Sequence, residues 1–194
     1  MLVAQGPQPA GQVGELDLQI ISMDSITNPP AVQGPEGGFT VSVALMPPHS
    51  RGTVRLSGAR RDAPSLLDPA LYADDHDLDA IVSGMRLARE IGRASELAPW
   101  RGEETLPGPE TGDGEAVRAC LRRTPASYCH PVGTCRMGED DRSVVGPDLR
   151  VHGVDGLRVA DASVFPTIPS ANTVATVYAV AERAADLVSG TRTH

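Results

Sequence analysis

Aromatic residues are scarce in this chain, where Phe, Trp and Tyr together make up 3% of 194 residues. Any core must therefore be built from Val, Leu, Ile and Ala, and the apolar fraction of 40% is slightly low for an ordinary globular domain. Gly and Pro are plentiful instead, with 20 and 17 copies, which indicates many turns and loops. A chain of this length forms one large domain or two small ones.

Basic charge is scarce as well. The chain has 17 Lys and Arg residues against 25 Asp and Glu residues, which gives a formal net charge of −8 at pH 7. Such a chain has no electrostatic grip on nucleic acid or on an anionic membrane surface, so we expect neither as a partner. No apolar run reaches the roughly 18 residues that span a bilayer. Residues 1–14 also lack the basic and apolar regions of a secretory signal.

Cysteine is the third rarity. The chain has three cysteines, an odd number, and they lack the paired spacing of a zinc site: Cys120, Cys129 and Cys135. This usage is typical of reduced thiols, so we expect a cytoplasmic protein. A metal site made of Cys129, His130 and Cys135 is an alternative, but adjacent ligands bind one ion awkwardly and a second pair is missing. A cysteine nucleophile beside His130 is another, although no oxyanion-binding motif accompanies it.

Short strands are predicted in the first third of the chain. Apolar and polar residues alternate over 16–20 and again over 39–45, which is typical of half-buried strands. A third strand is predicted near 54–56, after a turn. Residues 1–14 are rich in Gln, Gly and Pro, and we expect a flexible lead-in without assigned structure.

Helices are predicted further along the chain. Apolar residues recur at helical spacing over 75–91 and over a last segment that begins at 172 or 173 and ends at 188. A shorter helix is predicted over 115–123. The acidic first turn of the 75–91 helix suits the positive end of the helix dipole, which favours a solvated helix end over a metal site. A short strand is predicted over 157–159.

One segment carries more chemical information than the rest. Residues 130–138 read HPVGTCRMG, and they are followed by LRVADAS at 157–163 and by Asn172. Further short motifs precede them in the chain: DLQ at 17–19, PHSRGTVRL at 48–56, DL at 77–78 and LPG at 106–108. In this order, over about residues 15–188, the motifs resemble the C-terminal half of the glucose–methanol–choline (GMC) family of flavin-dependent alcohol oxidoreductases.

The resemblance implies an α+β fold in three parts. Residues 1–14 form the lead-in, residues 15–127 form part of the family's substrate-side antiparallel sheet with helices, and residues 128–194 form the catalytic and FAD-contacting segment. This last segment would add one strand and one long helix to an FAD-binding sheet whose other strands are missing here. A lone strand and helix cannot bury their apolar face, so we expect an exposed apolar patch that marks a missing partner.

The family's dinucleotide-binding half is missing from this sequence. That half opens with a strand, a Gly-x-Gly-x-x-Gly turn and a helix, whose backbone approaches the FAD pyrophosphate. The nearest candidate, GPEGG at 34–38, has the wrong spacing, contains a proline and precedes a predicted strand. We therefore expect full FAD binding only together with the missing half, which is carried either by a second chain or by a longer product of which this sequence is a fragment.

By resemblance, His130 is the catalytic base and Asn172 occupies the second catalytic position. Histidine ionises near neutral pH and can take and return a proton, whereas asparagine can only hydrogen-bond the substrate oxygen. Asp161 and Ala162 would contact FAD through backbone N–H groups, and Asn172 and Thr173 would direct the start of the last helix toward the flavin ring. Without its motif, His130 would be read as a solvated loop residue and Asn172 as a helix cap.

Two functions remain open on this basis. The first is an FAD-dependent oxidation of a small-molecule alcohol, with hydride transfer from CH–OH to flavin once the missing half is present. The alternative is a truncated, non-catalytic relative that acts as a protein-binding scaffold. The retained pair of His130 and Asn172 favours the first function, and the missing dinucleotide-binding half favours the second.

Overall fold

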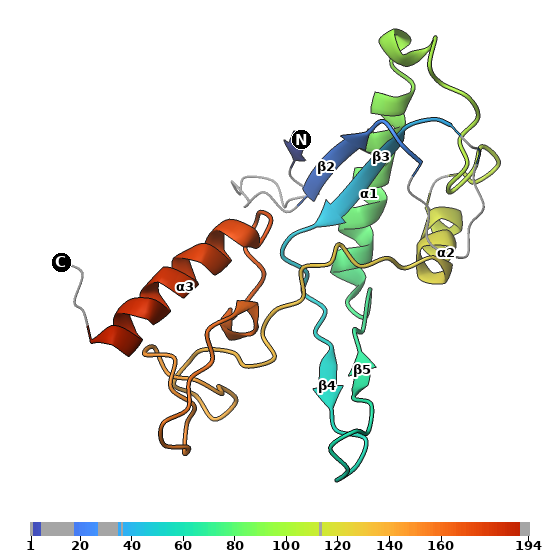
Figure 1. The fold of residues 1–194 in the computed structure, drawn as a ribbon. Coiled ribbons are helices and arrows are strands. Elements are labelled where there is room, and N and C mark those ends of the chain that lie inside the picture. Colours follow the sequence, from blue (N-terminus) through green and yellow to red (C-terminus); the bar gives the residue numbers. More distant parts are fainter. Residues whose placement is uncertain (1, 5–17, 27–34, 36, 113, 191–194) are drawn as a thin grey trace, which may run out of the picture. The chain divides into compact units, whose positions relative to one another are not determined.

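The computed structural model describes residues 2–4, 18–26, 35, 37–112 and 114–190 (Figure 1). These residues form helices and two small antiparallel sheets, in agreement with the predicted α+β class. The chain divides into two compact units. The first comprises the described residues of Met1–Gly52 and Pro69–Tyr128, and the second comprises Thr53–Asp68 and the described residues of Cys129–His194. The division predicted from the sequence, between residues 127 and 128, stays a prediction.

A three-stranded antiparallel sheet forms part of the first unit. Its spatial order is β1 (Leu2–Ala4), β2 (Leu18–Met23) and β3 (Thr40–Leu45). The alternating patterns predicted β2 and β3, although residues 16 and 17 of the first pattern lie outside the described residues. The expected lack of structure in the lead-in is wrong for β1, which pairs with β2. Its three residues, Leu, Val and Ala, are all apolar and show no alternation, so the sequence does not reveal this strand.

Helix α1 (Asp75–Gly92) covers one face of this sheet (Figure 1), and its bounds confirm the predicted helix to within one residue. Asp74 caps the helix by accepting a hydrogen bond from the backbone N–H of His76 at 2.9 Å. The buried apolar residues of the helix are Leu78, Ala80, Ile81, Val82 and Ala88. Their spacing is the period from which the helix was predicted.

Gly84 lies where α1 approaches the sheet closely. A Cβ atom added there would lie 3.3 Å from Leu18 Cδ1 and closer still to Val43 Cγ1. Gly84→Ala should therefore lower the free energy of unfolding by about 1–3 kcal/mol, because the crowded contact outweighs the gain in helix propensity. Urea denaturation followed by circular dichroism measures the change.

Gly92, in the last turn of the same helix, provides the matched control. A Cβ atom added to Gly92 meets no atom within 4 Å. Gly92→Ala should leave the free energy of unfolding unchanged or raise it slightly. Equal losses of stability in the two variants would show that close packing at Gly84 is not the cause.

Helix α2 (Glu115–Arg123) lies beside α1 and has the predicted bounds. Arg118 of α2 forms an ion pair with Asp79 of α1. The loop between the two helices is held to α1 by Arg89, whose guanidinium contacts Glu104 at 2.9 Å. These contacts complete the first unit.

The second unit contains a two-stranded hairpin and a long helix. The hairpin pairs β4 (Thr53–Arg55) with β5 (Leu66–Asp68), and the helix is α3 (Val174–Ser189). The sequence predicted β4 and α3, but not β5, because adjacent Leu66 and Leu67 give no alternating pattern. The buried core of the unit is small and consists of Val145, Leu149, Val164, Phe165 and Ala184.

The predicted strand over 157–159 is wrong. Arg158 forms a single isolated antiparallel bridge with Arg150. A strand extends only where its neighbour offers a continuous ladder of hydrogen bonds, and here the neighbouring segment enters a turn at 152–153.

Helix α3 exposes large apolar side chains, as the resemblance predicts for the last helix. Val174, Tyr178 and Val188 are 57%, 69% and 71% exposed. Exposure of this extent on one helix is typical of a surface that a partner covers. Among the described helices, none is long and apolar enough to cross a bilayer.

Candidate active site

His130 lies in a tightly bent loop of the second unit. The backbone φ values of Cys129 and Gly133 are both positive, at 61° and 86°, so the chain turns sharply on either side of His130. The φ restricts Gly133, whereas an added Cβ would make only an ordinary contact, 3.4 Å from the backbone oxygen of Phe165. The glycine in HPVGTCRMG therefore allows the positive φ that this turn of the loop requires.

Backbone hydrogen bonds tie this loop to the 3₁₀ turn Ala162–Val164. The N–H of Cys135 donates to Ser163 O at 3.0 Å, and the N–H of Met137 donates to Val164 O at 2.8 Å. Two motifs that are separated in the sequence, HPVGTCRMG and LRVADAS, thus lie side by side in the second unit.

The start of α3 meets the same loop. Thr173 Oγ1 lies 3.2 Å from His130 Nδ1, across a sequence separation of 43 residues. Thr173 is buried, with 8% of its surface exposed, and both His130 and the neighbouring Asn172 are half-buried. The structure therefore brings His130 together with the pair of residues that precedes α3.

Asp161 and Ala162 lie at the start of the 3₁₀ turn. Asp161 Oδ1 accepts a hydrogen bond from the Ser163 N–H at 2.8 Å and so caps the turn. Hydrogen bonds from Ser163 lower the pKa of Asp161, which keeps its carboxylate charged at neutral pH. The carboxylate thus has a structural partner, and contact with FAD through backbone groups stays a prediction.

Arg136 received no role in the sequence analysis. Its guanidinium forms an ion pair with Asp140 at 2.6 Å. The hydrogen bond from Arg136 lowers the pKa of Asp140 to about 2. The pair closes the turn that follows HPVGTCRMG, so we assign it a structural role.

A cluster of possible metal ligands lies in the first unit. The ligand atoms of His49, His76 and Asp77 lie within 4.8 Å of one another, and the two imidazole rings stack at 4.2 Å. Asp77 is buried, and its two oxygens accept the backbone N–H groups of His49 and Ser50 at 2.7 and 2.8 Å. Because Asp77 already binds the backbone and is adjacent to His76 in sequence, we assign it to anchoring the loop on α1 rather than to a metal.

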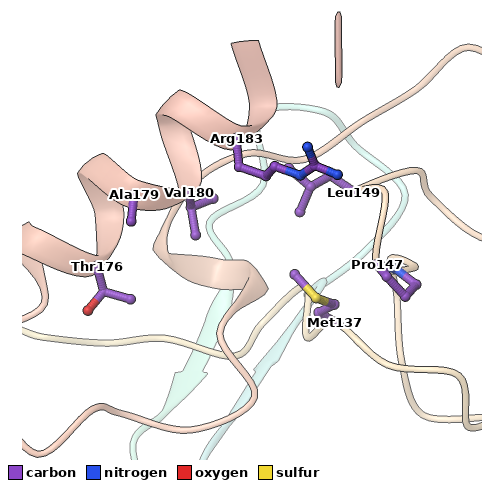
Figure 2. Close-up of a pocket in the computed structure, with 7 residues that line it drawn as sticks. All are labelled: Met137, Pro147, Leu149, Thr176, Ala179, Val180 and Arg183. Carbon is purple, nitrogen blue, oxygen red and sulfur yellow. The ribbon is translucent and has the colours of Figure 1, made fainter. Parts of the chain in front are cut away.

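An apolar pocket of about 190 Å³ lies between α3 and the segment from Met137 to Leu149 (Figure 2). Its lining consists of Met137, Pro147, Leu149, Thr176, Ala179, Val180 and Arg183. None of the predicted site residues lines this pocket, so it is separate from the group around His130.

Comparison with known proteins gives consistent matches. The family model of GMC oxidoreductases matches residues 48–181. Choline oxidase from Arthrobacter globiformis is 44% identical over 162 residues, which cover 81% of this chain and 30% of the relative. The crystal structure of pyridoxine 4-oxidase from Mesorbium loti superimposes with a TM-score of 0.77 at 30% identity, covering 93% of this chain and 36% of that chain.

A further solved structure, an FAD-dependent oxidoreductase from Chaetomium thermophilum, gives a TM-score of 0.73 at 32% identity, covering 82% of this chain and 28% of that chain. The chain spans about a third of the length of these three proteins. The matching region is the C-terminal region of the family. This chain therefore belongs to the GMC oxidoreductase family and corresponds to its C-terminal region.

Proposed function

We propose that this chain is the catalytic C-terminal part of an FAD-dependent oxidoreductase that oxidises the CH–OH group of a small alcohol. The observation that carries the proposal is the 3.2 Å contact between His130 Nδ1 and Thr173 Oγ1, which sets a titratable side chain against the start of α3. Choline and pyridoxine, after which two of the similar proteins are named, are both alcohols. This supports an alcohol as the substrate class.

His130 would take the hydroxyl proton of the substrate. Imidazole is suited to this because its ordinary pKa lies near neutral pH. The amide of Asn172 would donate a hydrogen bond to the substrate oxygen as negative charge develops there. Since an amide cannot accept the proton, the proton transfer falls to His130 alone.

FAD, when bound, supplies the hydride acceptor. The donors at this site fit such a group: α3 has 16 residues, and its first backbone N–H groups and positive dipole end lie beside the His130 loop. Asn172 and Thr173 would hold the flavin ring there. Because the carboxylate of Asp161 caps its own turn, Asp161 and Ala162 would contact the cofactor through backbone N–H groups.

The dinucleotide-binding half would be supplied by a second chain, with neither nucleic acid nor a membrane as a partner. Support comes from the exposed apolar side chains of α3. Covering these side chains would remove apolar surface from water, which favours association.

Tyr178 provides a test of this partner. Its side chain is 69% exposed on α3, and a large aromatic residue on a docking surface commonly dominates binding. Tyr178→Ala should weaken binding of the dinucleotide-binding half by about tenfold or more. Val154→Ala is the control, since Val154 is an exposed apolar residue on a turn outside α3. Isothermal titration measures both, and equal weakening would argue against a specific role for α3.

The proposed reaction is tested by mixing the holoprotein with a panel of alcohols in the absence of oxygen. We expect at least one primary alcohol, with choline and pyridoxine in the panel, to bleach the visible absorbance of the flavin. A holoprotein that keeps its oxidised spectrum with every alcohol would contradict the proposal.

A non-catalytic scaffold is the second candidate function. The exposed apolar face of α3 is the observation that favours it, because such a face serves any protein partner. A protein that binds its partner without taking up FAD would favour this candidate over the enzyme.

A further inference from the structure

Thr173 occupies the residue before α3 but does not cap the helix. A threonine at this position ordinarily has extended backbone angles and accepts a hydrogen bond from the first turn. Thr173 instead has helical angles, φ −71° and ψ −17°, and its side chain makes no capping hydrogen bond. Its hydroxyl contacts His130 Nδ1 at 3.2 Å. The hydroxyl is thus turned from the helix toward the histidine.

This contact bears on which ring nitrogen of His130 can accept a proton. A neutral imidazole carries its hydrogen on one nitrogen and offers a lone pair on the other. If Nδ1–H donates to Thr173 Oγ1, Nε2 is the acceptor. The same hydrogen bond also persists once the ring is protonated, since both nitrogens then donate. If the Thr173 hydroxyl instead donated to Nδ1, this hydrogen bond would be lost when the His130 ring is protonated, because Nδ1 would then carry a hydrogen.

We propose that the Thr173 hydroxyl holds His130 in the Nδ1–H tautomer and so makes Nε2 the atom that accepts the substrate proton. This inference rests on the proposed function, and it gives Thr173 a role beyond the flavin contact through its backbone. Thr173 is a positioning residue, because it acts through His130. Its burial, with 8% of its surface exposed, limits competition from water for the hydrogen bond.

The tautomer can be measured directly by nitrogen NMR on the protein as isolated from its host, labelled with ¹⁵N-histidine. At a pH where His130 is neutral, we expect its Nδ1 to give the chemical shift of a protonated ring nitrogen. Thr173→Val keeps the side-chain shape but removes the hydroxyl, so the Nε2–H form should become at least several-fold more populated. Thr173→Ser restores a hydroxyl and should restore the original tautomer.

Thr176→Val, three residues further along and exposed, is the control that should change nothing. In the holoprotein, kcat with an alcohol should fall about tenfold in Thr173→Val, as for other groups that only orient a functional histidine, and recover in Thr173→Ser. A wild-type His130 in the Nε2–H form, or an unchanged tautomer in Thr173→Val, would overturn the inference. The NMR measurement of the His130 tautomer does not require turnover. Its result therefore tests the role of Thr173 independently of the proposed reaction.

Discussion

Replacing His130 with alanine is expected to lower kcat for alcohol oxidation by roughly 10²- to 10⁴-fold, which is the usual contribution of a general base. The loss should be this large because the neighbouring Asn172 cannot take the proton. Bound FAD should remain, since the residues that we propose to hold it are others. Steady-state rates and the visible spectrum of the same preparation measure the two effects separately.

His76→Gln is the matched control for the His130 variant. His76 is an exposed histidine in the first unit, stacked on His49, and has no proposed part in the reaction. We expect wild-type rates from this variant. If His130→Ala kept full activity with a normal flavin spectrum, the assignment of His130 as the base would be wrong.

The second large effect is expected on stability, at Asp77. This side chain is 2% exposed, and its two oxygens accept the backbone N–H groups of His49 and Ser50. Asp77→Ala would leave both donors without this acceptor and detach the loop from α1. We expect the free energy of unfolding to fall by about 2–4 kcal/mol, because hydrogen bonds to a charged group are among the stronger ones. Urea denaturation measures the fall.

Asp75 is the control for Asp77. It lies in the same first turn of α1, but its side chain is 85% exposed. Asp75→Ala should cost less than about 1 kcal/mol, through the weakened interaction with the helix dipole. A similar loss in both variants would mean that the acidic first turn, rather than the buried hydrogen bonds, stabilises the unit.

The helices are the part of the fold that the sequence predicts best. The apolar stripes of α1 and α3 repeat at helical spacing and predict both helices, and the predicted bounds of α2 also agree with the structure. The failures share a cause. Strands β1 and β5 show no alternating pattern, and the segment over 157–159 forms one bridge, so whether each of them forms a strand depends on how it pairs with another segment. Local sequence does not encode that pairing.

In the site, too, some features could be predicted from the sequence and others could not. HPVGTCRMG and Asn172 were located through the family resemblance, and composition or periodicity alone would have left His130 as an ordinary loop residue. The contact between His130 and the Thr173 hydroxyl spans 43 residues and could not be predicted. The sequence offers Asn172 as the helix cap, whereas Thr173 is the residue that directly precedes α3, and its backbone angles and its contact with His130 indicate a role other than capping.

The central claim is that this chain works as the catalytic part of a flavoenzyme. The most direct test is the visible absorption spectrum of the protein purified under native conditions from its host, with the co-purifying chains counted on a gel. We predict a flavin spectrum together with a second chain that carries the dinucleotide-binding half. A colourless single chain that takes up no added FAD would contradict the claim and leave the scaffold as the better account.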